Sequence, residues 1–387
     1  MSKKLVGILG ISLVWQALPA MAATGLEGVS LSGFMTAGAS YADKQLLTNS
    51  NAVSQDGSIE NTPGFTADSR LGVQISAKVN QDISVTGQLL AKARENNSNT
   101  KADWAFITYR VNEPVSIRVG KIKFPTFLIS DYYEVGYAYP WIRPPQEVYS
   151  LNPITTLNGA DILAQFRFGD MTLLLQPYYG VSRGATTLAP QEALSALSPA
   201  QPAGSVYSVG FTTDEYRGIN VGLSSDIFTA RLGYLTTRVN ASALGVFHDM
   251  AMFASAGLSM DWRNVVLYSE VAKREIDGSA NLAFPNQKAS YATLGYRIGK
   301  WMPLITTARI ADNNNPKTLL GTPLKQTSKT LGLRYEVGSG SALKFEAQKI
   351  TPEKGTRGLL IANPNGATAK EKSDHVMFYG IAIDVVF

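Results

Sequence analysis

Apolar and polar side chains alternate along most of the chain. Residues 70–79 show the pattern clearly, because every second side chain is apolar and those between are polar or small. Successive side chains of a β-strand point to opposite faces, so this period of two predicts a strand with one apolar face. Residues 83–95 repeat the pattern after only Asn80-Gln81-Asp82, which predicts a tight hairpin between the two strands.

The alternation continues to the last residue and predicts about sixteen strands. They lie at residues 29–42, 66–79, 83–95, 102–112, 115–122, 159–168, 171–180, 216–225, 228–239, 251–262, 265–276, 288–299, 303–312, 327–337, 341–350 and 373–387. A stretch at 205–212 either adds a strand or extends the one at 216–225, so the pattern leaves sixteen or eighteen strands open. Most segments have the roughly 9–11 residues that a tilted membrane strand needs, about twice the length of a soluble strand.

The connections between these strands alternate in length. Short ones fall at 80–82, 113–114, 169–170, 226–227, 263–264, 300–302 and 338–340, and the others are longer. This order predicts an all-β fold, an antiparallel up-and-down barrel that crosses a membrane with short turns on one side and long outer loops on the other. A soluble sandwich would also alternate, but its strands would be shorter. Aromatic residues near the short turns resemble the girdle at a membrane interface: Phe168, Phe228, Trp262, Trp301 and Phe387.

The first 22 residues have the three parts of a secretory signal peptide. Lys3 and Lys4 give a positive start, Leu5–Leu18 is an apolar run, and Ala20-Met21-Ala22 is a small-x-small cleavage pattern. The apolar run is shorter than the roughly 20 residues of a membrane-spanning helix. We therefore expect residues 1–22 to be removed on export and residues 23–387 to form the barrel.

Composition narrows the possible chemistry. Only 17% of the 387 residues are charged, against about 25% in a typical soluble domain. The absence of Cys excludes disulfides, thiolate metal sites and a Cys nucleophile. The net charge of +5 is small and dispersed, which argues against nucleic acid as a partner. His248 and His375 each adjoin an Asp whose side chain points the other way along an extended chain, and no Gly-x-Ser-x-Gly motif occurs. The sequence predicts neither an enzyme nor a bound cofactor or metal.

Residues 121–159 interrupt the alternation. They contain five Pro and eight large aromatic residues, mixed with acids and bases. Pro neither donates to a sheet nor fits a helix interior, so this stretch is predicted to be a long loop. Its aromatic residues supply surface to bury, which argues for an ordered and functional loop.

The chain ends in Asp384-Val385-Val386-Phe387, which resembles the terminal strand of outer-membrane barrels. With the signal peptide and the loop order, the whole mature chain resembles the Gram-negative sixteen-stranded porin superfamily. Residues 121–159 also look like the corresponding loop of porin-like proteins distantly akin to phosphate-selective porins. The resemblance implies a water-filled channel in the outer membrane, surrounded by its lipids, that passes small hydrophilic solutes. It also implies a homotrimer, and a third outer loop, here 121–159, that folds into the lumen and narrows the pore.

Porins of this superfamily commonly set acids on that loop against bases on the facing wall. Here the candidate acids are Asp131, Glu134 and Glu147, and the candidate wall bases are Arg70, Lys92, Arg94, Arg110 and Arg118. Lys121, Lys123, Tyr132 and Arg143 complete the predicted constriction. The same bases could instead be ordinary lumen lining paired with local acids. Because bases outnumber acids, we expect a mild preference for anions.

Several functions remain open at this point. The first is a passive diffusion pore, and the second is a channel selective for phosphate, another anion or a small organic solute. In the second, loop aromatics would form a binding track: Tyr132, Tyr137, Trp141 and Tyr149. The same rings would otherwise pack the loop against the wall. A plugged structural barrel would show almost no conductance. Small residues are candidates for a subunit contact: Ala37, Ala39, Ala254 and Ala256.

Overall fold

The structure is a computed structural model that describes most of the chain beyond the predicted signal peptide. The described residues are 28–43, 46–48, 58–59, 62–93, 99–190, 206–242, 245–278, 280–312, 324–354, 356, 358–362 and 375–387. The predicted signal peptide at 1–22 and the candidate residue Arg94 lie outside these ranges.

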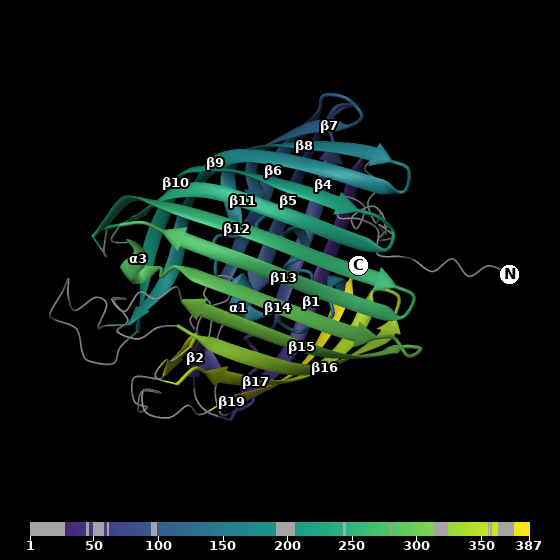
Figure 1. Ribbon diagram of the computed structural model, residues 1–387. Coiled ribbons are helices and arrows are strands. Elements are labelled where there is room, and N and C mark those ends of the chain that lie inside the picture. Colours follow the sequence, from purple (N-terminus) through teal and green to yellow (C-terminus); the bar gives the residue numbers. More distant parts are fainter. Residues whose placement is uncertain are drawn as a thin grey trace.

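Sixteen strands of the described chain form one closed antiparallel barrel (Figure 1). In chain order they are β1 (Val29–Ala42), β4 (Arg70–Lys78), β5 (Ile83–Lys92), β6 (Asn99–Arg110), β7 (Val115–Lys123), β8 (Thr156–Phe168), β9 (Met171–Pro190), β10 (Val206–Ser224), β11 (Phe228–Ala241), β12 (Val246–Trp262), β13 (Val265–Ile276), β14 (Gln287–Tyr296), β15 (Trp301–Asp312), β16 (Gln326–Gly338), β17 (Ser341–Pro352) and β19 (Val376–Val386). Each strand pairs with its neighbours along the chain, and β19 closes the barrel against β1. The predicted up-and-down barrel of about sixteen strands is confirmed.

The main difference from the predicted strands concerns β9 and β10. They are 20 and 19 residues long, about twice the predicted length. Their extra residues pair with each other within the stretch 181–215, which was expected to be a connection. Residues 206–212 therefore extend β10 and do not add a strand. The pairing of β10 with β9 has irregularities near Thr213, where one strand carries extra residues. Such bulges interrupt the alternation that a sequence pattern depends on.

A second sheet was not predicted. It is formed by β18 (Leu360–Ala362), β2 (Leu46–Thr48) and β3 (Ser58–Ile59), which pair in the order β18-β2-β3. Its strands have two or three residues each, too few to show a period in the sequence.

Burial alternates along the barrel strands as the sequence alternates. In β15, the side chains from Met302 to Ile310 at even positions are buried, and those from Trp301 to Arg309 at odd positions are exposed. We call the buried positions of a strand its inner face and the exposed positions its outer face. Large apolar side chains lie on the outer face, including Leu89, Ile305 and Leu331. Buried polar residues lie on the inner face, the inverse of a soluble protein and the arrangement of a membrane barrel.

Exposed aromatic rings collect beside the short turns. Phe168, Trp262, Tyr296, Trp301 and Phe387 are each close to half-exposed or more. The predicted girdle is therefore present, although Phe228 is only partly exposed. Girdles of this kind mark the level where a membrane barrel meets the headgroups.

The seam between β1 and β19 is fastened by the last residue. The backbone N–H of Gly33 donates to the carbonyl of Phe387 at 2.7 Å, and the N–H of Phe387 donates back at 3.0 Å. The Phe387 ring lies over Gly33, where an added Cβ would meet a ring carbon at 2.5 Å. Gly33 and the terminal Phe387 therefore fit one another where the barrel closes.

The helices of the described residues are short. The stretch between β7 and β8 contains η1 (Ser130–Tyr132), η2 (Gly136–Ala138) and α1 (Gln146–Tyr149), and α3 (Ala280–Ala283) follows β13. Within the described chain, none of the helices is long and apolar enough to cross a membrane.

Candidate functional site

The stretch between β7 and β8, residues 124–155, is the candidate site, and we call it the connecting segment. It is shorter at both ends than the predicted loop, because Lys121–Lys123 belong to β7 and 156–159 to β8. Six of its eight large rings are buried and form part of the largest apolar cluster: Phe124, Phe127, Tyr133, Tyr139, Trp141 and Tyr149. The Pro and aromatic residues that interrupted the sequence pattern thus produce a packed segment.

Side chains from the barrel satisfy the backbone of the connecting segment. Carbonyl groups in the segment accept hydrogen bonds from several strand cations, among them Arg231, Arg334 and Lys344. Arg231 donates to Phe127 at 2.9 Å. Arg334 donates to Tyr137 and Tyr139 at 2.8 and 2.9 Å. Lys344 donates to Gly136 and Trp141, both at 2.7 Å. Buried backbone groups of a coil need such partners, so these cations hold the segment in one conformation.

Two carboxylates of the barrel accept hydrogen bonds from backbone N–H groups of the segment. The N–H of Leu128 donates to Glu270 at 2.9 Å, and that of Ile142 donates to Glu346 at 2.8 Å. The indole N–H of Trp141 adds bonds to Thr293 and Thr306, each at 3.0 Å. The segment is therefore bound to many strands of the barrel, not only to the two that it joins.

The structure brings three of the predicted site residues into one cluster. Lys92 Nζ lies 3.1 Å from Glu134 Oε1, and Arg70 donates to the Glu134 carbonyl at 2.8 Å and to the Tyr139 hydroxyl at 2.6 Å. Burial raises the pKa of the Glu134 carboxyl, but Lys92, Lys123 and Arg70 more than offset this and hold it below its ordinary value. Glu134 is thus an ionised group facing the bases of β4 and β5.

Two further predicted residues have partners that the sequence did not identify. Asp131 pairs with Arg231 of β11 at 2.5 Å, and Arg143 pairs with Asp68, whose Oδ1 lies 2.6 Å from Nε. Burial raises the pKa of Asp131, and the Arg231 guanidinium reverses this, so its pKa lies below the usual range. Alternation indicates that Arg231 faces inward, but no sequence signal pairs residues on such distant strands.

Glu147 has a different environment from the other two acids. It is fully buried, and its carboxylate accepts a hydrogen bond from Gln326 of β16 at 2.8 Å. Burial raises the pKa of Glu147 above its ordinary value. It therefore does not face the bases of β4–β7 in the manner that the sequence suggested.

Other predicted bases are paired along the wall near β6–β8. Arg118 donates to Asp161 at 2.9 Å and lies over the Phe106 ring at 5.2 Å. Lys123 Nζ lies 2.8 Å from Asp103, and Lys121 donates to the Ala102 carbonyl at 2.5 Å. Both partners of each pair belong to the barrel wall. This arrangement matches the alternative from the sequence, in which the bases line the lumen and pair with nearby acids.

Arg110 and Tyr132 complete the predicted set. Arg110 is exposed at the short-turn end of β6. Its backbone N–H donates to the Asp82 carbonyl at 2.8 Å. Arg110 therefore lies apart from the cluster around Glu134. Tyr132 is partly buried against two apolar clusters. Of the other track aromatics, Trp141 and Tyr149 are fully buried, and Tyr137 lies under the Arg334 guanidinium at 4.8 Å.

Among the described residues, no three or more His, Asp or Glu side chains are grouped so that they could hold a metal ion. The site is a network of ion pairs and backbone hydrogen bonds.

Comparisons with known proteins agree with the fold. A family model described as Gram-negative porin matches residues 10–354. No curated protein sequence matches significantly. Similar solved structures include an anion-selective porin from Comamonas acidovorans, at 14% identity and a TM-score of 0.57, covering 93% of this chain and 99% of that one. The outer membrane protein OmpT of Vibrio cholerae has 12% identity and a TM-score of 0.55, covering 94% and 99%. OmpF of Salmonella typhi, solved with daunomycin, has 11% identity and a TM-score of 0.55, covering 93% and 97%. At these identities the likeness concerns the fold alone.

Proposed function

Because the chain belongs to the Gram-negative porin family, we propose that it passes small hydrophilic solutes through a lumen that the connecting segment narrows. Family membership and the sixteen-stranded barrel make the protein an outer-membrane channel. The segment's role in that channel is the proposal. It rests on the network around Glu134, which joins the segment to Arg70 of β4 and Lys92 of β5.

The range of strands that the connecting segment contacts supports a position inside the barrel. Its hydrogen-bond partners include Arg70 of β4, Arg231 of β11 and Lys344 of β17. Thr293 of β14 is a further partner, because it accepts a hydrogen bond from the Trp141 indole. These strands are spread around the closed order, and all four partners are buried inner-face residues. A segment that reaches all of them crosses the lumen, and a narrowed lumen selects by width and charge.

A cluster of basic residues supports a mild preference for anions. Lys92, Lys101, Lys121, Lys123 and Arg70 surround Asp103 and Glu134, so five positive and two negative charges leave +3. Lys101 Nζ lies 4.0 Å from Asp103, and its side chain is 45% exposed, so it is accessible to ions. Rings of Lys and Arg favour anions in channels.

Reversal potentials in a KCl gradient across a planar bilayer test this preference. The wild type is expected to favour chloride, and Lys92→Gln/Lys101→Gln is expected to reduce that preference several-fold. As a matched control, Lys78→Gln/Lys300→Gln removes two exposed cations near the short turns and leaves the reversal potential unchanged. Cation selectivity in the wild type would overturn the proposal.

The buried rings of the connecting segment argue for packing and against a solute track. Tyr149 and Trp141 are no more than 1% exposed, so a sugar or aromatic solute would not reach their faces. We therefore favour a general diffusion pore over a channel selective for one solute. Export by the predicted signal peptide at 1–22 is part of this proposal, since a barrel reaches the outer membrane only after export.

A homotrimer also belongs to the proposal. Apart from Lys78 at the short-turn end of β4, the outer faces of β1, β4 and β5 carry apolar or small residues and no charge in the described chain, including Ala37 and Ala39. Gly87 of β5 lies on this face with open space around it. Gly87→Trp is expected to yield monomers by light scattering, whereas Ala292→Trp on the outer face of β14 keeps the trimer. A trimeric Gly87→Trp variant would argue against contact through this face.

A further inference from the structure

Five consecutive strands carry cations on their outer faces. The residue beside each of them in its strand is buried on the inner face, so the cations point away from the lumen. We call these residues the outer cation row: Lys273 (β13), Lys288 (β14), Arg309 (β15), Lys329 (β16) and Lys349 (β17).

Strand register makes the row continuous. Lys273 is directly opposite Lys288, and Lys329 is directly opposite Lys349. Arg309 lies between the two pairs, opposite Ser290 on one side and Thr327 on the other. Like charges directly opposite one another on a sheet repel, so the barrel alone gains nothing from this arrangement.

The row has almost no countercharge. On the outer faces of β13–β17, the described residues include one carboxylate, Glu275, which pairs with Lys273. Five positive charges and one negative charge leave a net charge of +4 on this face. An external anion would relieve the repulsion.

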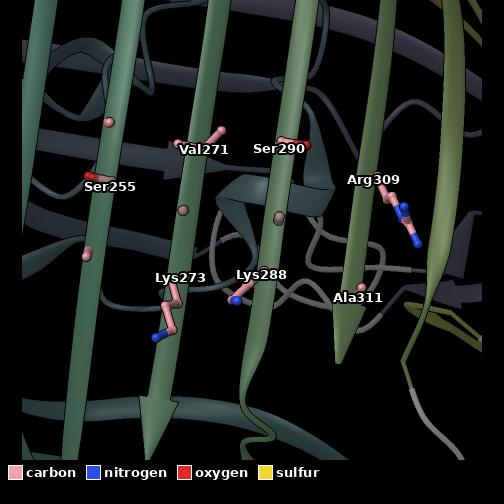
Figure 2. A pocket seen from close by; sticks show the side chains of 11 residues that line it. Ser255, Val271, Lys273, Lys288, Ser290, Arg309 and Ala311 are labelled. Carbon is pink, nitrogen blue, oxygen red and sulfur yellow. The ribbon is translucent and has the colours of Figure 1, made fainter. Parts of the chain in front are cut away.

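A hollow lies beside the row, with a volume of about 650 Å³. Figure 2 shows Lys273, Lys288 and Arg309 around it, on three successive strands. Small side chains form much of the rest of its lining, including Ala254, Ala256, Ser290 and Ala311. The face therefore combines a space bounded by small groups with cations at its edge.

The row lies near the outer edge of the membrane band. Lys288 is eight residues from Tyr296 of the aromatic girdle, and Arg309 is eight residues from Trp301. Eight residues of a strand tilted by about 40° rise roughly 20 Å, close to the 25 Å height of the apolar band of such barrels. The side chains between, such as Leu294 and Ile305, are exposed and apolar. The cations are thus at headgroup level on the side of the long loops.

The row has no counterpart on three strands of the barrel. Apart from Lys78 at the short-turn end of β4, the outer faces of β1, β4 and β5 have no charged residue in the described chain. Position on a membrane barrel alone therefore does not explain cations on five consecutive strands, four of them in directly opposed pairs.

We propose that the outer cation row binds the phosphate groups of a phosphorylated glycolipid in the outer leaflet of the outer membrane. The phosphates would lie between the paired lysines and Arg309, and acyl chains would run along the apolar outer face toward the girdle. Arg and Lys bind phosphate oxygens through strong charge-assisted hydrogen bonds. Lipid bound in this way shields the opposed lysines from one another.

Native mass spectrometry of the full protein in non-ionic detergent tests the proposal, with bisphosphorylated lipid A as the probe. The wild type is expected to retain the lipid, and Lys288→Gln/Arg309→Gln/Lys329→Gln is expected to weaken binding by at least about tenfold. Removal of both phosphates from the lipid is expected to weaken binding to the wild type similarly.

Lys78→Gln/Arg263→Gln/Lys300→Gln is the matched control, because it removes three exposed cations near the short turns. Heat-dependent gel mobility confirms that each variant is a folded barrel. Equal affinity of the row variant and the wild type would overturn the proposal, and so would equal binding of the dephosphorylated lipid. A row variant that loses subunits but keeps the lipid would instead identify a subunit contact. None of these outcomes depends on conductance, so the test is separate from that of the channel.

Discussion

Arg143 and Asp68 form a buried ion pair that attaches the connecting segment to the residues before β4. Nε of Arg143 lies 2.6 Å from Oδ1 of Asp68, and both side chains are almost completely buried. Burial lowers the pKa of the Arg143 guanidinium, but the Asp68 carboxylate more than offsets this and raises it. Each charge therefore depends on the other for its stability.

Arg143→Leu is expected to cost about 3–5 kcal/mol of unfolding free energy, because it leaves the Asp68 charge buried without a partner. Urea unfolding of the folded barrel, followed by tryptophan fluorescence, measures this cost. The double variant Asp68→Leu/Arg143→Leu is expected to lose less than Arg143→Leu alone. Equal losses in the single and double variants would show that the charge pairing is unimportant.

Glu147 gives the opposite case, a buried acid without a cation partner. Its folded-state pKa is raised by burial above the ordinary value of 4.5. The folded state therefore binds this proton more tightly than the unfolded state does. The stability that Glu147 contributes is fully present below about pH 4.5 and is lost as the pH rises through the raised value.

Glu147→Gln is expected to remove this loss, because the amide keeps a polar group beside Gln326 without a charge. The variant should melt at a higher temperature than the wild type at pH 7–8, and the difference should shrink toward pH 4. Scanning calorimetry between pH 4 and 8 measures both curves. A variant that is less stable than the wild type at pH 8 would contradict this account of Glu147.

The candidate acids show how far sequence reasoning reaches at the scale of residues. Glu134 faces Arg70 and Lys92, as its position opposite the early strands suggested. Asp131 instead pairs with Arg231, which is 100 residues away in the chain. Such a partner depends on the path of the connecting segment between distant strands, which no local pattern encodes.

At the scale of elements, the alternation of apolar and polar residues predicted the regular strands. Strands such as β13, whose bounds match the prediction at 265–276, alternate between buried and less buried positions from Val265 to Ala272. The extensions of β9 and β10 were not predicted, because bulges near Thr213 shift the phase of the alternation. The short helices of the connecting segment have three or four residues each, too few for a helical period.

Gly136 shows how closely the connecting segment fits the seam of the barrel. A Cβ at this position would overlap the Asp384 carboxylate of β19 and lie 2.8 Å from the Thr36 hydroxyl of β1. Its carbonyl also accepts a hydrogen bond from Lys344 at 2.7 Å. No side chain fits here without displacing the segment.

Gly136→Val is expected to loosen the connecting segment while the barrel strands persist. Amide hydrogen exchange, measured by mass spectrometry, should become faster in residues 130–142 by at least about tenfold and remain slow in β13–β17. Gly210→Val is the matched control, since nothing lies within 4 Å of a Cβ at Gly210. Unchanged exchange in residues 130–142 would show that the fit at Gly136 is unimportant.

At the scale of the whole molecule, the two faces of the barrel have different tasks. The outer face meets lipid with exposed apolar residues, and the inner face carries the buried ion pairs that hold the connecting segment. The sequence predicted this division because one alternating pattern sets both faces. It did not predict the registered outer cation row, since cross-strand neighbours such as Lys273 and Lys288 are known only once the strands pair.

The two ends of the connecting segment lie close enough for a short linker to join them. The side chains of Thr126 and Asn152 are hydrogen-bonded at 3.0 Å, so a short Gly-Ser linker can replace residues 128–150. Heat-dependent gel mobility shows whether the shortened chain still forms a closed barrel. Only a folded variant enters the comparison.

Single-channel conductance of this shortened chain in planar bilayers, compared with that of the wild type, tests the central claim most directly. If the connecting segment narrows the lumen, the shortened channel conducts several times more current per opening, because a wider aqueous path has lower resistance. A folded, shortened barrel with the conductance of the wild type would contradict the account.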